Sequence, residues 1–261
     1  MIRYCYHSHT NFSDGIHSPE EMIQAAIAKG FHSIGISDHA PMTYDADWVI
    51  PPSRMEEYLK TLRDLQSKYA DQIKVYVGLE QDALAMPLPG GLDYYIGSVH
   101  CIKKDGRNIE LDLSVQTLRD AIRDSYGGDA DALAEDYYDL VASYADDSQV
   151  AFIGHFDLIT KFDEKESPIF PKTPRYTAAW QKAALRLVGA GKIFEINTGA
   201  ISRGYRTSPY PDGEILQFLG EHGGKVLISS DCHSAESLDT AFGLAEELID
   251  KYRLNHVELF A

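Results

Sequence analysis

Short apolar runs alternate with longer amphipathic stretches along the whole chain. The short runs cover residues 2–6, 33–36, 74–79, 94–99, 150–154, 192–196 and 226–230. Short runs of this length between helical patterns predict strand–helix units and a parallel sheet. A further run at 257–260 is a candidate additional strand with no assigned place.

The predicted helices between these runs have recognisable start signals. Ser18 and Glu21 have the spacing of a capping box, in which each residue satisfies a free backbone N–H of the first turn. Ser53 and Glu56 predict a second capping box. Further helices are predicted over 129–146, 174–190, 213–222 and 235–252.

Histidines and acids stand at the ends of nearly all the predicted strands. His7 and His9 follow the first run and, being two apart, point to the same side of a strand. Asp231 and His233 repeat this spacing after the last run. Single residues follow the other runs, namely His39, Glu80, His100 and His155. The carboxyl ends of barrel strands form one face, so these side chains are expected to converge there.

Packing alone would be the ordinary explanation for one histidine at a strand end. We accept that explanation for His32, His222 and His256, which lie in helical or terminal segments. Packing alone does not explain six histidines and two carboxylates that all lie at the same ends of their strands. Burying a polar group costs free energy unless the group has a hydrogen-bond or charge partner. Coordination of divalent ions such as zinc, manganese or iron would satisfy them together.

The amino-acid composition and the net charge argue against several classes of function. The chain has 261 residues and a formal net charge of −16, from 40 acids and 24 bases, which disfavours binding of nucleic acid. No apolar run approaches the roughly 20 residues of a membrane span, and no signal peptide is visible. Three scattered cysteines, Cys5, Cys101 and Cys232, favour a reducing compartment, and we expect a cytoplasmic protein with no membrane partner.

Several motifs together resemble the PHP (polymerase and histidinol phosphatase) family. They are His-Ser-His-Thr-Asn-Phe-Ser-Asp-Gly at 7–15, Ser-Asp-His-Ala-Pro at 37–41, Gly-Leu-Glu at 78–80, Gly-Ser-Val-His at 97–100, Gly-His-Phe-Asp at 154–157 and Ser-Asp-Cys-His at 230–233. Phe-Glu-Ile-Asn-Thr-Gly at 194–199 resembles the stand-alone histidinol-phosphate phosphatase branch. The resemblance implies an α/β fold, a distorted (β/α)7 TIM-like barrel, as one domain over residues 1–261.

The resemblance also implies a site for two or three metal ions. One ion would be held by His7, His9, Glu80 and Asp231. A second would share Glu80 and add His100 and His155, and a third would take His39, His233 and a residue of the first loop. For that loop we favour Asp14 as the ligand. His17 would then be a neighbour that touches the substrate, or a plain loop residue.

The implied reaction is hydrolysis of L-histidinol phosphate by a hydroxide held between metal ions. Glu80, Asp231 and His233 are the implied catalytic residues. Arg203 and Arg206 are candidates for the phosphate, and Lys161 stands where many relatives carry an arginine. A cationic head of the substrate could meet the loop residues Tyr44, Asp45, Asp47, Trp48, Asp82 and Asp112, which are otherwise plain surface residues.

Other functions stay open at this point. A PHP-type phosphodiesterase or exonuclease acting on nucleotides or single-stranded nucleic acid is the first alternative, although the chain has no basic groove. A phosphatase for another small phosphate ester is the second. A metal-binding regulatory domain with a decayed site is a non-enzyme alternative, opposed by the presence of all the inferred ligands. The oligomeric state is not predicted.

Overall fold

Eight parallel strands form one sheet in the computed structural model, which describes residues 2–165 and 167–260. In spatial order they are β1 (Tyr4–Cys5), β2 (Ser33–Ile36), β3 (Lys74–Asp82), β4 (Tyr94–Ser98), β7 (Val150–Ile153), β8 (Ile193–Asn197), β9 (Lys225–Ser229) and β10 (Asn255–His256). Neighbours in space follow chain order, and every pairing in this sheet is parallel. This is the arrangement of a (β/α) barrel, and the seven predicted strands are confirmed.

Among the described residues, the segments that follow β1 and β9 are joined at the carboxyl side of the strands. Ser8 forms a parallel bridge with Cys232, and the backbone N–H of His9 donates to the Cys232 carbonyl at 2.9 Å. At the opposite side, β10 pairs with β9 instead. The barrel is therefore distorted, as expected. The prediction of a strand at 257–260 was wrong, since the strand is Asn255–His256 and only Val257 continues its hydrogen bonding.

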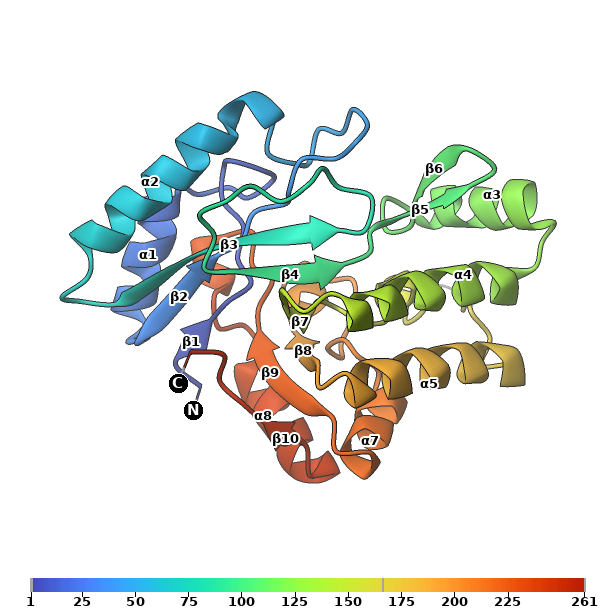
Figure 1. Ribbon diagram of the computed structural model, residues 1–261. Coiled ribbons are helices and arrows are strands. Elements are labelled where there is room, and N and C mark those ends of the chain that lie inside the picture. The colour runs from blue at the N-terminus through green and yellow to red at the C-terminus, as the bar shows by residue number, and fades with distance from the viewer. Residues whose placement is uncertain (1, 166, 261) are drawn as a thin grey trace.

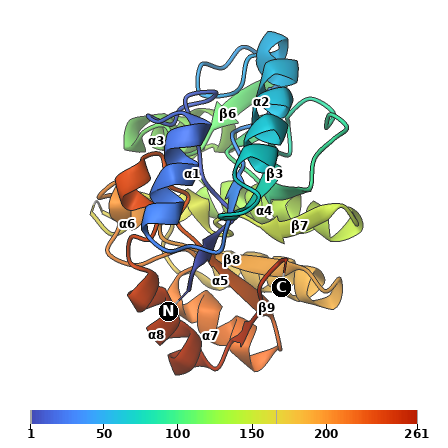
Figure 2. The ribbon, with the colours of Figure 1, turned by 90° about the vertical axis from the view of Figure 1, so that its left-hand side faces the viewer.

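Helices cover the outside of the sheet (Figures 1 and 2). They are α1 (Pro19–Ala28), α2 (Met55–Lys68), α4 (Ala130–Ser143), α5 (Pro174–Gly189), α7 (Gly213–Glu221) and α8 (Phe242–Tyr252), with a short α6 (Gly199–Ser202). The capping box of Ser18 and Glu21 is confirmed. The second one is wrong, because a 3-10 turn at Pro52–Arg54 precedes α2 and no side chain caps it.

One insertion between β4 and β7 was not predicted. It consists of the antiparallel hairpin β5 (Cys101–Lys104) and β6 (Arg107–Glu110), followed by α3 (Val115–Tyr126). Figure 1 shows the hairpin projecting beyond the carboxyl end of β4. This insertion therefore reaches the face of the barrel where the ligand residues lie.

Large side chains fill the barrel interior. They form a cluster of Tyr4, Tyr6, Tyr94, Ile96, Phe152 and Leu227. The Tyr94 hydroxyl donates to the Tyr6 carbonyl at 2.6 Å, so this side chain crosses the interior. A Cβ at Gly78 would lie 2.4 Å from the ring of Tyr94, which explains why β3 carries glycine there.

We expect Gly78→Ala to destabilise the protein by about 1–3 kcal/mol, because overpacking forces the surrounding side chains or backbone to shift. Urea unfolding followed by circular dichroism would measure this. Gly243→Ala is the matched control, since a Cβ there meets nothing within 4 Å, and its midpoint should be unchanged or slightly higher. Equal midpoints for both variants would contradict the packing argument.

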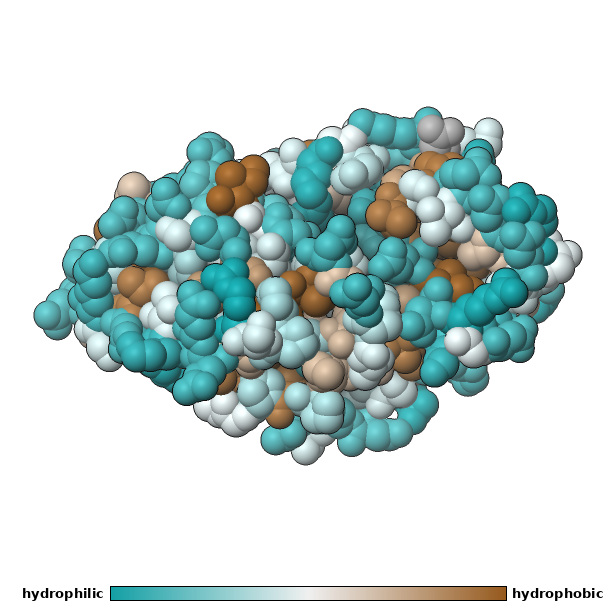
Figure 3. Space-filling model, turned by 90° about the horizontal axis from the view of Figure 1, so that it is seen from above, coloured by the Kyte–Doolittle hydropathy of each residue, from teal (hydrophilic) through white to brown (hydrophobic). Residues whose placement is uncertain are grey.

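The surface carries few large apolar side chains. Figure 3 shows a face covered mainly by hydrophilic residues, with apolar ones in scattered groups. Among the described residues, no helix combines the length and the apolar character needed to cross a bilayer. Cys5, Cys101 and Cys232 are all free and buried.

Candidate active site

Hydrogen bonds beyond the ends of the strands bring the predicted ligands to one level. The N–H of Ser37 donates to the Ser8 carbonyl at 2.9 Å, and the N–H of Glu80 donates to the Asp38 carbonyl at 3.0 Å. His39 forms a parallel bridge with Glu80. Because these contacts keep the first three strands in register past their formal ends, His7, His39 and Glu80 become neighbours.

Nine side chains gather there in four overlapping groups, each with ligand atoms within 4.8 Å of one another. The groups are His9, Asp14, His39 and His233; His7, Glu80 and His155; His7, His9 and Asp231; and His39, Glu80 and His100. All nine residues predicted as metal ligands are included. These groups differ from the three ligand sets that were predicted for the three ions. His9 lies with ligands of both the first and the third predicted sets, and His39 also lies beside Glu80.

Glu80 is the centre of this cluster. Its Oε2 lies 2.8 Å from His39 Nδ1 and 3.2 Å from His7 Nε2, while its Oε1 lies 2.8 Å from His155 Nε2. Burial raises the pKa of this carboxyl, but the surrounding histidines, His7 first, hold it well below its usual range. Glu80 is therefore ionised, and its two oxygens face different sets of histidines.

Asp231 occupies an unusual backbone position directly after β9. Its φ of 45° is in the left-handed region, which is uncommon for a non-glycine residue and recurs at functional sites. Its Oδ1 lies 3.1 Å from His9 Nε2. Burial raises the pKa of Asp231, whereas Arg203 and then His7 lower it well below the usual value, so this residue is also ionised.

In the first loop, Asp14 rather than His17 joins the ligand atoms. Asp14 Oδ2 lies 3.1 Å from His233 Nε2, and Oδ1 lies 3.7 Å from His39 Nε2. His17 instead accepts a hydrogen bond from the N–H of Ala235 at 3.2 Å and does not line the cavity described below. This placement does not support contact between His17 and a substrate.

Glu195 and Asn197, on β8, form a layer behind the ligands. Glu195 Oε1 accepts from His7 Nδ1 at 2.7 Å, and Oε2 accepts the backbone N–H of His155 at 2.9 Å. Asn197 donates to Glu195 at 2.8 Å and to Asp231 at 3.2 Å. A carboxylate that holds one nitrogen of an imidazole leaves the other nitrogen free to bind metal, as is common in metal sites.

Two further buried acids support the site from behind. Asp82 accepts the backbone N–H of His100 at 2.6 Å, so it is not part of a substrate box. Asp38, although next to His39 in the sequence, accepts from the N–H of Thr10 at 2.7 Å and from the Ser13 hydroxyl at 2.5 Å. It positions the first loop, and thereby Asp14.

The donor atoms fit divalent ions. Several buried atoms lie near oppositely charged groups but form no hydrogen bond of suitable geometry with the described residues, namely Nε2 of His7, both ring nitrogens of His9, Oε2 of Glu80, and Nδ1 of His100 and His155. Burial and the neighbouring rings of His233 and His39 lower the pKa of His9 to about 3, so its imidazole is neutral. Neutral imidazoles and ionised carboxylates with unused lone pairs are the expected ligands of zinc, manganese or iron, and a bound cation would satisfy them.

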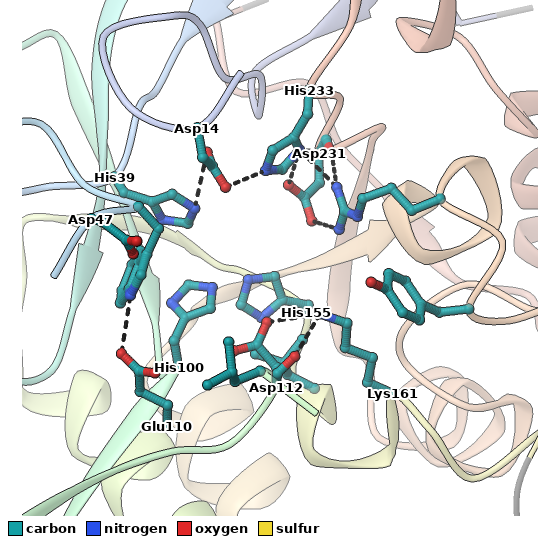
Figure 4. Close-up of a pocket in the computed structure, with 15 residues that line it drawn as sticks. Asp14, His39, Asp47, His100, Glu110, Asp112, His155, Lys161, Asp231 and His233 are labelled. Atoms are coloured by element: carbon teal, nitrogen blue, oxygen red, sulfur yellow. Dashed lines mark hydrogen bonds and ion pairs between the residues drawn. The ribbon is translucent and has the colours of Figure 1, made fainter. Parts of the chain in front are cut away.

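A cavity of about 320 Å³ opens beside these atoms. One wall consists of ligand residues, Asp14, His39, His100, His155, Asp231 and His233 (Figure 4). The other walls come from the loop after β2, the β5–β6 insertion and the segments after β7 and β8. Of the loop residues considered above, Asp47, Trp48 and Asp112 line the cavity, whereas Tyr44 and Asp45 do not.

Arg203 and Lys161 both reach the cavity. Arg203 donates to the Asp231 carbonyl at 2.7 Å and to Asp231 Oδ2 at 3.0 Å, and its Nη1 lies 2.7 Å from His233 Nδ1. Lys161 donates to Asp112 Oδ2 at 3.0 Å. A guanidinium in this position offers a planar fork to a phosphate beside the ligand cluster.

Arg206 does not line the cavity, contrary to its predicted role as a phosphate contact. It is only 4% exposed and donates to Thr160 Oγ1 at 2.6 Å and to Ser208 Oγ at 3.1 Å. Its guanidinium also lies 4.5 Å from the ring centroid of Tyr210. Arg206 thus ties the segment after β7 to the segment after β8.

We expect Glu195→Gln to lower kcat/KM by roughly ten- to a hundred-fold, because an amide cannot accept from both His7 and the His155 N–H as the carboxylate does. Metal content and steady-state rates of the purified variant would measure this. Glu56→Gln, at an exposed position of α2, is the control and should be unaffected. Normal rates and metal content in both variants would show that Glu195 does not position the ligands.

The chain is similar in sequence and in fold to several known proteins. The family described as PHP domain matches residues 6–199. A Schizosaccharomyces pombe protein named "Probable histidinol-phosphatase" is 28% identical over 251 residues, which cover 89% of this chain and 80% of that protein. The histidinol-phosphatase of Bacillus subtilis is 25% identical, over 84% of this chain and 88% of that protein. In structure, the chain resembles the histidinol phosphate phosphatase of Lactococcus lactis, solved with zinc, L-histidinol and phosphate, with a TM-score of 0.72 at 20% identity, covering 97% of this chain and 95% of that one.

Proposed function

The chain belongs to the PHP domain family, and we propose that it is a metal-dependent phosphomonoesterase that hydrolyses L-histidinol phosphate. The relatives named as histidinol-phosphatases match most of its length and support this substrate. The observation that carries the proposal is the convergence of nine ligand-type side chains around Glu80, beside a cavity that also contains Arg203.

We further propose that the nine residues would hold two or three divalent ions, with Glu80 at the centre of the ligand set. Zinc, manganese or iron held there would supply Lewis acidity toward the phosphate oxygens and would lower the pKa of a water molecule. The mixture of imidazoles and carboxylates suits each of these metals. Glu195, Asp82 and Asp38 would keep the ligands oriented through the contacts described above.

The residues of the chain would bind and orient the phosphate at the same place. Arg203 would present its N–H groups to two phosphate oxygens, since its fork geometry matches such an anion. Glu80 and Asp231 would stay ionised and would not compete as proton donors while they face cations.

The net charge of −16 does not oppose this function. Distant surface charges are screened by salt over about 8–10 Å, whereas cations within the site act at contact distance. Local charge therefore decides whether a phosphate enters. The same overall charge disfavours a long polyanion such as DNA, which would contact the acidic surface as well as the site.

Phosphate release from L-histidinol phosphate, by protein loaded with manganese, zinc or iron, tests the proposal. We expect turnover that a chelator reduces to background and that added metal restores, because the ligands without cations cannot polarise the phosphate. Single-stranded DNA serves as the comparison substrate. DNA degradation without phosphomonoesterase activity would favour the exonuclease alternative, and bound metal without any turnover would favour a regulatory domain.

A further inference from the structure

The corner of the chain that follows β8 lies directly behind the ligand cluster. Asn197 ends β8, and Gly199 begins the short helix α6, which leads to Arg203. Both residues are buried. Neither of them lines the cavity or belongs to the nine ligand-type residues. Any part that this corner has in the reaction must therefore be exerted through other residues.

The two carboxylate oxygens of Asp231 have different partners. Oδ1 lies 3.1 Å from His9 Nε2 and 3.6 Å from His7 Nε2, on the side of the ligand cluster. Oδ2 instead accepts hydrogen bonds from Arg203 at 3.0 Å and from Asn197 Nδ2 at 3.2 Å. Since a carboxylate oxygen has two lone pairs, two donors occupy those of Oδ2. Oδ1 is therefore the oxygen of Asp231 that is left for a cation.

Gly199 packs directly against Asp231. A Cβ at Gly199 would lie 2.9 Å from the Cβ, the carbonyl oxygen and Oδ2 of Asp231, which is closer than real Cβ contacts. Gly199 is not among the glycines with a positive φ, so its backbone conformation would accept a side chain. The contact with Asp231 is thus the reason why glycine is required at this position.

Asn197 links this corner to the layer behind the ligands. Its Oδ1 accepts the backbone N–H of Gly199 at 2.9 Å, and its Nδ2 donates to Glu195 Oε2 at 2.8 Å as well as to Asp231 Oδ2. One amide thus donates to two carboxylates that would otherwise repel each other. Because Glu195 holds the His7 ring, Asn197 joins the supports of two ligands.

We propose that Asn197 and Gly199 are positioning residues, which keep Oδ1 of Asp231 turned toward the ligand cluster and Oδ2 turned away from it. This inference rests on the proposed function, since it concerns the same site. Arg203 donates to the carbonyl of Asp231 at 2.7 Å and to its Oδ2. The corner therefore also sets the place of the guanidinium, and disturbing it would weaken the binding of metal and of phosphate together.

Manganese binding by Gly199→Ala tests this role without substrate. We expect the affinity, measured by competition with a chelator, to fall roughly ten- to a hundred-fold, the usual effect of losing the support of a metal ligand. Gly189→Ala is the matched control, because a Cβ there meets nothing within 4 Å, and its affinity should equal that of the wild type. Unchanged manganese affinity in a folded Gly199→Ala protein would overturn the proposal.

Asn197→Leu provides a second variant, of similar volume but without hydrogen-bonding groups. It should lower manganese affinity to a similar extent while the circular dichroism spectrum stays that of the wild type. In both variants, with manganese in excess, inorganic phosphate should inhibit turnover more weakly because the guanidinium of Arg203 is displaced. If both variants fail to fold while Gly189→Ala folds, the corner supports the fold and not the ligands, and the proposal is wrong.

A crystal structure of Gly199→Ala gives a readout that needs neither turnover nor metal. It should show the Asp231 carboxylate displaced from Arg203 and Asn197, and an unmoved carboxylate would count against the positioning role. The two proposals also fail separately. Weaker manganese binding by the variants, together with a wild type that does not hydrolyse L-histidinol phosphate, would refute only the proposed substrate. Hydrolysis by the wild type with unchanged manganese affinity in the variants would refute only the positioning role.

Discussion

Replacing Glu80 by glutamine should reduce kcat/KM for a phosphomonoester by about a thousand-fold or more. Bound cations stabilise the negative charge of the transition state by several kcal/mol, and loss of that stabilisation corresponds to a rate change of this size. Both oxygens of Glu80 face histidines, at 2.8 Å on either side, and the residue is only 1% exposed. The amide of glutamine lacks the charge and has one acceptor oxygen in place of two, so it would bind divalent cations more weakly.

Metal content, measured with the rates, shows why activity is lost. We expect the Glu80→Gln variant to retain fewer ions per chain than the wild type, with an unchanged circular dichroism spectrum. The exposed Glu56→Gln variant again serves as the control. A Glu80→Gln variant with near-normal kcat/KM would show that this carboxylate is not the centre of the site, whatever the metal content.

Replacing Arg203 by lysine should lower kcat/KM by roughly a hundred- to a thousand-fold, the usual effect of removing one preorganised donor to a developing negative charge. Arg203 bonds to Asp231 through two nitrogens and also approaches His233, so it is held rigidly at the cavity wall. Lysine keeps the charge but offers a single ammonium group, which cannot bond to Asp231 and to two phosphate oxygens in the same planar arrangement.

Arg206→Lys is the matched control for this experiment. Arg206 lies three residues further along the chain but is buried away from the cavity, so its replacement should lower the free energy of unfolding and leave kcat/KM of the folded protein nearly unchanged. Kinetics and urea unfolding of both variants would test the pair. A large kinetic loss in Arg206→Lys with little loss in Arg203→Lys would reverse the assignment of the phosphate-binding arginine.

Strand order and the position of the ligands could be predicted because both depend on local patterns. Each of the seven strands is a short apolar run between helical stretches, and parallel strands in chain order place their carboxyl ends together. The hairpin β5–β6 was not predicted, because its second strand, Arg107–Glu110, buries only Ile109 and lacks a clear alternation of apolar and polar residues. Glu110 was therefore not considered, although it lines the cavity.

Contacts between distant side chains could not be predicted in the same way. Arg203 and Arg206 were equivalent in the sequence, yet one lies in the cavity and the other is buried with Thr160 and Ser208. Asp38 is adjacent to His39 in the sequence, but the path of the first loop gives it Thr10 and Ser13 as partners. These outcomes depend on how loops from different strands cross, which no local pattern specifies.

By itself, the amino-acid sequence determined which kinds of ligand are present and that they stand at the carboxyl ends of parallel strands, since residue type and strand periodicity are local properties. Only the tertiary structure decided which atoms face one another, because that requires Ser8 and Cys232, at opposite ends of the chain, to close the barrel. It also decided that Asp47 and Glu110 line the same cavity as Lys161 and Arg203. The net charge of the side chains that line a cavity depends on several chain segments, and these segments come together only in the folded protein.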